Sequence, residues 1–122
     1  MVREVTPAEL EKEVKRSKLL FVDCWAPWCG PCLALAPVLE ELAVKYKNNP
    51  DVTFLKLNTQ THSMFAFQQG INAIPCVLVF YRGKPAKFTE PVPQGRKGSE
   101  TDRLIGLRPA KDYETVIAQL LS

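Results

Sequence analysis

Short apolar runs alternate along this chain with segments of helical periodicity. Three runs have the length of buried strands and contain neither glycine nor an internal proline: 19–25, 52–57 and 76–81. Segments with apolar positions at helical spacing precede or separate them: 7–17, 30–47 and, more weakly, 61–69. This alternation predicts an α/β domain in which helices connect the strands.

Local signals support the first two helices. Thr6 followed by Pro7, with Glu9 three residues after the threonine, is typical of a helix N-terminus. Pro37 lies inside the second predicted helix, 30–47, and should kink it, because its ring removes one backbone donor and crowds the preceding turn.

The second half of the chain departs from strict alternation. The run 76–81 is followed by a turn and by a second short strand near 86–89, which together predict an antiparallel hairpin. Prolines, glycines and charges in 90–101 predict an exposed loop, and 110–121 has the pattern of an amphipathic helix. Parallel pairing first and a hairpin afterwards predict a mixed sheet with helices on both faces.

Composition restricts the class of protein. With 122 residues, of which 46% are hydrophobic and 24% charged, residues 1–122 are expected to form one domain around one core, without internal repeats. A net charge of +3, spread along the chain, does not indicate nucleic-acid binding, and the apolar runs are too short to span a membrane. We therefore expect binding to neither nucleic acid nor a membrane. We also expect the protein to be a monomer.

The cellular compartment is predicted from the cysteines and from the first residues. Four cysteines are too few for a disulfide-stabilised secreted domain, and the mixed charges of residues 1–17 do not resemble a secretory signal or a transit peptide. These features favour the cytoplasm. An organelle remains open, because a presequence could have been removed before Met1.

Two cysteines in the motif Cys29-x-x-Cys32 carry the clearest chemistry. Gly30 and Pro31 suit a turn into the helix that follows, so Cys29 is expected at a helix N-terminus. The helix dipole and the free amide groups there lower the pKa of a thiol, which makes Cys29 an exposed nucleophile near neutral pH and leaves Cys32 more buried. Attack by Cys29 on a disulfide followed by displacement by Cys32 would transfer the disulfide to this protein.

Asp23 lies in the apolar run just before the motif. Burial should raise the pKa of its carboxyl group, so it could accept the proton that Cys32 must lose, through a water molecule. The alternative is a buried polar residue with a purely structural role.

The sequence from Trp28 to Cys32, WCGPC, resembles the redox pentapeptide of the thioredoxin family. Further matches to the family over 7–121 are the buried carboxylate, the helix proline, the lysine near the carboxylate, the cis-proline and the glycines of the last strands: Asp23, Pro37, Lys56, Pro75, Gly83 and Gly106. The resemblance implies the thioredoxin fold, a central mixed five-stranded sheet flanked by four helices. It also implies the reduction of protein disulfides.

The resemblance further implies the roles of individual residues. Catalysis is assigned to four residues: Cys29, Cys32, Asp23 and Lys56. Substrate binding is assigned to an apolar groove around Cys29: Trp28, Ile74, Pro75 and Gly106. Structural roles fall to Gly30, Pro31 and Pro37. The implied partners are protein substrates that contain a disulfide and an electron donor of the thioredoxin-reductase type, with no cofactor besides the redox-active cysteine pair.

Three features differ from the family pattern. Leu33 follows the second cysteine, where lysine or arginine is usual, so the rim of the site is less positive. Cys24 and Cys76 are implied to lie on adjacent strands, either as a second disulfide or as two buried, inert thiols. The region between Gly83 and Gly106 is longer than usual by on the order of fifteen residues, a length that surface loops tolerate well.

This extra segment is open to two interpretations. It is either a neutral surface insertion or a specificity element, in which cationic residues near the groove rim select a partner: Arg96, Lys97 and Arg103. A dedicated, partner-specific redox factor would use it in this way.

Three other functions are compatible with parts of this pattern to different degrees. A zinc site would need a second paired spacing, and His62 with the scattered cysteines does not supply one, so we expect no metal. Disulfide oxidases and isomerases share the fold but usually carry histidine between the cysteines, whereas Gly30 and Pro31 favour a reductase. A binding or assembly module that uses the groove without redox turnover also remains open.

Overall fold

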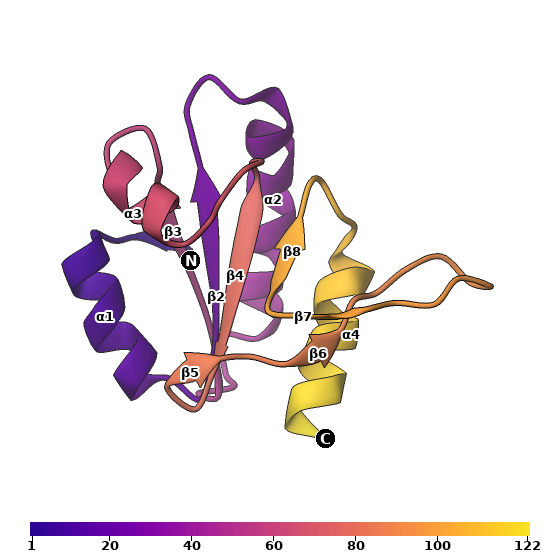
Figure 1. Ribbon diagram of the computed structural model, residues 1–122. Helices are drawn as coiled ribbons and strands as arrows, with labels where there is room; N and C mark the ends of the chain where they lie inside the picture. Colours follow the sequence, from indigo (N-terminus) through magenta and orange to yellow (C-terminus); the bar gives the residue numbers. More distant parts are fainter.

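The computed structural model describes residues 1–122 as a twisted sheet between two layers of helices (Figure 1). The helices are α1 (Pro7–Arg16), α2 (Gly30–Lys45), α3 (Ser63–Gln68) and α4 (Ala110–Leu121). The strands are β1 (Arg3–Glu4), β2 (Leu19–Trp25), β3 (Val52–Asn58), β4 (Cys76–Tyr81), β5 (Lys84–Pro85), β6 (Phe88–Thr89), β7 (Glu100–Thr101) and β8 (Arg103–Ile105). None of the helices combines the length and the apolar character needed to cross a bilayer.

The main sheet has five strand positions in the order β1-β3-β2-β4, followed by an edge that β5 and β8 share. Strands β1, β2 and β3 are parallel, whereas β4 is antiparallel to β2, β5 and β8. Strand β2 is central, and its Asp23 pairs with Lys56 on β3 and Val77 on β4. The expected mixed five-stranded sheet with four helices is confirmed.

Apolar side chains of β2 point alternately into two cores. Phe21 faces α2 and α4, where it stacks on Phe54 at 5.0 Å between ring centroids and meets Tyr113 edge-on at 5.9 Å. Val22 and Cys24 face the core under α1 and α3. Because both faces are covered, the strand is apolar almost without interruption, as is typical of parallel strands in a sheet with two helical layers.

The predicted element boundaries hold to within a few residues. Thr6 caps α1, since its hydroxyl accepts a hydrogen bond from the Glu9 amide at 3.2 Å while the Glu9 carboxylate accepts one from the Thr6 amide at 2.9 Å. Pro37 lies inside α2, as expected. Strand β1 was not predicted, because its two residues are charged and exposed and join the sheet only through the backbone.

The edge strand of the main sheet is built from two separate segments. In an antiparallel pair the residue numbers of partners have a constant sum. This sum is 165 where β4 pairs with β5 and 181 where β4 pairs with β8. The edge strand therefore contains sixteen more residues than a continuous strand would have. They enter opposite Val79, whose carbonyl accepts a hydrogen bond from the Ala86 amide at 2.9 Å and whose amide donates one to the Asp102 carbonyl at 3.0 Å. We call residues 87–101 the arm.

The structure of the arm shows that the predicted hairpin at 86–89 and the predicted loop at 90–101 are partly wrong. A strand near 86–89 was expected beside 76–81, but β6 pairs with β7 in a separate two-stranded ribbon, and β7 lies at the end of the predicted loop 90–101. Figure 1 shows the arm projecting sideways from the sheet edge. The pattern was misleading because Phe88 is a buried apolar residue in a segment of strand length.

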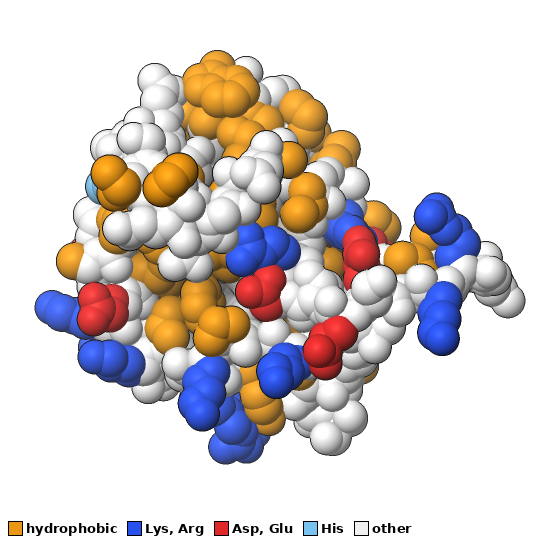
Figure 2. Space-filling view, viewed as in Figure 1, with side chains coloured by type: hydrophobic (Ala, Val, Ile, Leu, Met, Phe, Trp, Pro, Cys, Tyr) orange, Lys and Arg blue, Asp and Glu red, His pale blue; other side chains and the backbone are white.

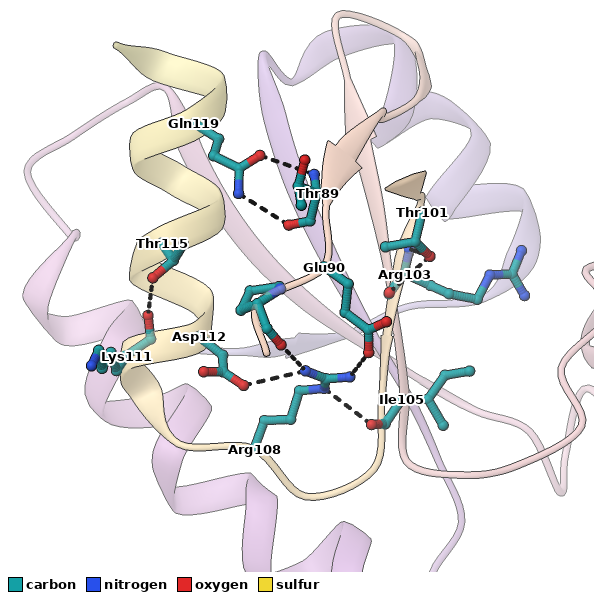
Figure 3. A network of polar contacts seen from close by, with 11 residues as sticks. Thr89, Glu90, Thr101, Arg103, Ile105, Arg108, Lys111, Asp112, Thr115 and Gln119 are labelled. Carbon is teal, nitrogen blue, oxygen red and sulfur yellow. Dashed lines mark hydrogen bonds and ion pairs between the residues drawn. The ribbon is translucent and has the colours of Figure 1, made fainter. Parts of the chain in front are cut away.

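Two side chains attach the arm to the rest of the fold (Figure 3). Gln119 of α4 makes hydrogen bonds to both the amide and the carbonyl of Thr89, each at 3.0 Å. Arg108, which is largely buried, donates to the Pro91 and Ile105 carbonyls and pairs with Glu90 and Asp112. Arg108 thus joins the arm, β8 and α4.

This attachment leads to a stability prediction. Arg108→Met keeps most of the apolar stem but leaves two carboxylates and two carbonyls without their donor, so we expect the free energy of unfolding to fall by about 2 kcal/mol. Urea unfolding measures this loss. Arg96→Met, at the exposed tip of the arm, is the matched control and should change stability by less than about 0.5 kcal/mol. Equal values for the two variants would contradict the assigned role of Arg108.

Candidate active site at the carboxyl end of the central strand

The cysteine pair lies where the central strand passes into α2. Cys29 is the N-cap residue of α2, and Cys32 lies in its first turn. The two are disulfide-bonded, with their Cα atoms 5.2 Å apart, and the Cys32 amide donates to the Cys29 Sγ at 3.2 Å. The sulfur of Cys29 therefore lies at the positive end of a 16-residue helix, where a thiolate is stabilised.

Both cysteines are more buried than predicted for a reactive pair. Cys29 is 6% exposed and Cys32 2%, so the expected order holds, but Cys29 is not an exposed residue in this disulfide form. The Sγ of Cys29 lies 3.8 Å from the carbonyl oxygen of Ile74, which shows what covers it. The backbone before Pro75 thus approaches the sulfur that a substrate would meet.

Asp23 is buried two residues beyond Phe21 on β2, and therefore on the sheet face that α2 covers. Its Oδ1 atom is buried and has no hydrogen-bond partner. Burial raises the pKa of this carboxyl group to about 7, while the charge of Lys56 acts in the opposite direction. The predicted upward shift of the pKa is thus confirmed, and Asp23 changes charge near neutral pH.

Lys56 lies next to Asp23, as the resemblance implied. The two residues are in register on neighbouring parallel strands, and the Lys56 Nζ lies 5.5 Å from the centre of the Trp25 ring. Its positive charge is the main influence that favours the ionised form of Asp23. Glu4 on β1 acts weakly in the other direction.

The loop before β4 and the loop after β8 meet beside Cys29. The Ile74–Pro75 peptide bond is cis, and the Pro75 carbonyl accepts a hydrogen bond from the Gly106 amide at 2.8 Å. Gly106 has a φ of +88°, a left-handed conformation that glycine adopts most easily. Pro75 and Gly106, predicted from distant parts of the sequence, are therefore in direct contact.

Trp28 forms the opposite rim and is 71% exposed. A groove of about 450 Å³ separates it from Ile74 and continues along the start of α3, where Thr59 and Ala66 contribute to its walls. The four residues predicted to bind substrate thus surround the cysteine pair.

Pro31 and Gly30, the residues between the two cysteines, differ in how well the structure explains them. Pro31 is the second residue of α2, where a missing amide proton costs nothing. At Gly30, by contrast, an added Cβ would meet no atom within 4 Å, and its φ is not positive. Space and backbone conformation therefore do not require glycine at this position.

Several apolar residues around the site are exposed, and of these only Leu33 was predicted. Ile105 and Leu107 flank Gly106 and are 49% and 54% exposed, and Leu33, predicted as an apolar rim residue, is 56% exposed. On α3, Phe67 is 81% exposed. A search for apolar residues near the motif glycines would have found the first two, whereas the helical pattern gave Phe67 no distinct signal.

Cys24 and Cys76 face each other across β2 and β4, as the resemblance implied. Both are fully buried and unbonded, on the sheet face opposite to Asp23. Burial is the main cause that raises the pKa of each thiol, and at Cys76 the Arg103 guanidinium opposes it. These two cysteines therefore have the character of inert core thiols.

The fold and the cysteine pair at the start of α2 define a thiol-disulfide oxidoreductase. The family model "Thioredoxin" matches residues 1–106, and the chain belongs to the thioredoxin family. The Cys29–Cys32 pair, at disulfide distance in a chain of this family, carries thiol-disulfide oxidoreductase activity by dithiol-disulfide exchange.

Relatives span the whole chain. A thioredoxin of Pyropia yezoensis is 38% identical over 122 residues, covering 99% of this chain and 98% of the relative. A thioredoxin of Alicyclobacillus acidocaldarius is 34% identical over 117 residues, covering 96% and 95%. Among solved structures, oxidised thioredoxin of Plasmodium falciparum covers both chains completely at a TM-score of 0.73 and 23% identity. Chloroplastic thioredoxin z has a TM-score of 0.77 at 24% identity, over 98% of this chain and 94% of that one.

The buried Asp23 carboxyl group predicts how stability depends on pH. Its pKa is about 7 in the folded protein against 3.8 ordinarily, so between these values the folded chain holds a proton that the unfolded chain has lost. The contribution of Asp23 to the free energy of unfolding therefore falls as the pH rises from about 4 to about 7, and then levels off. Asp23→Asn removes this dependence and should stabilise the protein at pH 8 by on the order of 3 kcal/mol.

Urea unfolding across this pH range tests the prediction. Asp51→Asn, a largely exposed carboxylate at the start of β3, is the control and should follow the parent protein at every pH. Parallel curves for the parent and Asp23→Asn would show that Asp23 is not buried in its charged form.

Proposed function

We propose that this single-domain protein acts as a reductant of protein disulfides, with Asp23 as the proton acceptor of its resolving cysteine. The observation that supports this most directly is the position of a buried carboxyl group with a pKa near 7 on the sheet face under α2, the helix that carries Cys32. The steps below follow from this arrangement.

In the first step the Cys29 thiolate attacks one sulfur of a substrate disulfide. A bond forms between Cys29 and that sulfur, and the other substrate sulfur leaves as a thiolate. The N-terminus of α2 stabilises the attacking thiolate, as it does the Sγ that now accepts the Cys32 amide. The mixed disulfide holds the substrate on the protein.

In the second step Cys32 attacks Cys29. Cys32 first gives up its proton to Asp23 through a water molecule, and its thiolate then forms a bond to the Cys29 sulfur, which releases the substrate sulfur bonded to Cys29 as a thiolate. Two electrons have moved to the substrate, and the Cys29–Cys32 disulfide remains. Lys56 tunes this step, because its charge keeps the pKa of Asp23 from rising beyond the neutral range.

Substrate binding is proposed for the groove formed by Trp28, Ile74, Pro75 and Gly106. The Ile74 carbonyl, 3.8 Å from Cys29, can accept a hydrogen bond from an extended substrate segment that passes the sulfur. Such pairing positions a substrate backbone without reading its side chains.

The reduced state must be restored from outside, since the chain holds no other redox group besides two inert thiols. We propose an electron donor of the thioredoxin-reductase type, no cofactor, action as a monomer and a cytoplasmic location. The free Cys24 and Cys76 support a reducing compartment. One similar structure is chloroplastic, so an organelle is the alternative location.

Reduction of insulin in the presence of dithiothreitol tests the redox function. Cys29→Ser should lose all activity above the uncatalysed rate, and Cys32→Ser should accumulate a mixed disulfide that mass spectrometry detects. Cys24→Ala, which removes a buried thiol outside the mechanism, is the control and should keep the activity of the folded protein. A Cys29→Ser variant that supports the protein's role in cells would favour a binding or assembly module instead.

The role of Asp23 has a separate kinetic test. In the parent, the rate of the resolving step should rise through about pH 7 as Asp23 ionises. Asp23→Asn should be about tenfold slower at pH 7, and the difference should shrink at pH 9, where Cys32 loses its proton to solvent. Rapid-quench analysis of mixed-disulfide decay measures this step. A constant ratio of rates from pH 6 to pH 9 would exclude Asp23 as the acceptor.

A further inference from the structure

The segments that surround the redox pair contain no Asp, Glu, Lys or Arg, although 24% of the chain is charged. These segments are residues 24–39, 57–81 and 104–107. They include the start of α2, the whole of α3, the cis-proline loop and the turn after β8. Such long uncharged stretches are expected in a core, but these three also reach the surface.

Their exposed side chains are strongly apolar. Six of the eight large hydrophobic residues that are exposed belong to these segments: Trp28, Leu33, Met64, Phe67, Ile105 and Leu107. The other two, Met1 and Val44, lie elsewhere. Figure 2 shows apolar side chains gathered at the upper end of the molecule, with the red and blue groups lower down or on the arm. We call this end the uncharged face.

Two cations near the uncharged face, Lys56 and Arg108, already contact other groups of the protein. Lys56 lies beside Asp23 with its Nζ over the Trp25 ring. Arg108 pairs with Glu90 and Asp112 and donates to two carbonyls.

Arg103, predicted to act at the groove rim, is also occupied. It pairs with Asp102 and donates to the carbonyl of Gln69 at 2.8 Å. Arg96 and Lys97 lie on the arm, which leaves the sheet opposite Val79 and projects sideways (Figure 1). Arg103 and Arg108 are therefore already paired, and the Lys56 ammonium group lies against the Trp25 ring.

The uncharged face continues from the redox pair onto α3. The groove between Trp28 and Ile74 leads past Ala66 and Ile71, and Met64 and Phe67 on α3 are 66% and 81% exposed. An extended chain held at Cys29 would therefore meet apolar surface well beyond the groove around the cysteines.

The absence of charged side chains from the segments of the uncharged face indicates which substrate side chains it can bind. A charged side chain brought against it would lose water without gaining a partner, which is unfavourable, whereas apolar and uncharged side chains gain from burial. We propose that this protein selects disulfides whose flanking residues are uncharged and apolar, and that Met64 and Phe67 of α3 form part of the docking surface. This inference rests on the proposed reductase function.

A series of matched peptides tests the substrate class. Each peptide carries the same disulfide in an extended segment, flanked by Val and Thr, by Lys, or by Glu, and the reduced protein is the only reductant. Because each reduced protein molecule reacts once, the measured quantity is the second-order rate constant of reduction, and we expect it to be about tenfold higher for the uncharged peptide than for either charged one. Its value should also stay constant from low salt to about 0.5 M, since no charges steer the encounter.

Variants locate the docking surface. Phe67→Ser and Met64→Ser should each lower the second-order rate constant for the uncharged peptide about threefold. Val44→Ser, which removes an equally exposed apolar residue away from this face, is the matched control and should have no effect. Leu33→Lys should improve reduction of the Glu-flanked peptide relative to the others and make it dependent on salt.

The small uncharged bis(2-hydroxyethyl) disulfide separates this inference from the proposed function. If neither it nor any peptide is reduced, the reductase function itself fails. If it is reduced and all three peptides react at equal rates, the function stands and the proposed selectivity is wrong. Equal effects of Phe67→Ser and Val44→Ser would likewise remove α3 from the docking surface.

Discussion

The pairing of strand β2 on both edges and its coverage on both faces determine where every part of the site lies. Phe21, Val22 and Cys24 fill two separate cores, and the backbone is bonded to β3 and β4 along its length. The carboxyl end of the strand is therefore fixed, and α2 must begin close to it. A helix N-terminus that is held in this way can stabilise a thiolate without any charged side chain.

The burial of β2 allows Asp23 to exchange a proton near neutral pH, and it also makes the ionised form of Asp23 destabilising. A carboxylate in the middle of a fully covered strand loses its hydration, which raises its pKa into the range where it can exchange a proton. The ionised form then weakens the fold above neutral pH. Lys56, in register on the neighbouring strand, limits this effect and keeps the group ionisable.

The sequence was sufficient for the three long strands of the main sheet, the four helices and the cysteine pair, because apolar runs, a capping box and the WCGPC motif are local signals. It was insufficient where backbone pairing or distant contacts decide the outcome. Strand β1 has no apolar residue, the split of the edge strand depends on register with Val79, and the burial of Cys29 depends on the Ile74 carbonyl. The exposure of Phe67 follows from a short helix with no neighbour over that side chain, which periodicity alone does not reveal.

The split edge strand explains how sixteen residues enter the sheet without disturbing the site. Val79 keeps both of its backbone hydrogen bonds, one to Ala86 before the arm and one to Asp102 after it, so the ladder of β4 is not interrupted. Strand β8 then runs beside Cys76 to Leu78 and brings the Gly106 amide to the Pro75 carbonyl. Arg108 and Gln119, which both lie outside the arm, hold its base against α4. The arm therefore contributes to neither the redox pair nor the docking surface, which are formed by β2, α2, α3 and the two loops that meet at Gly106.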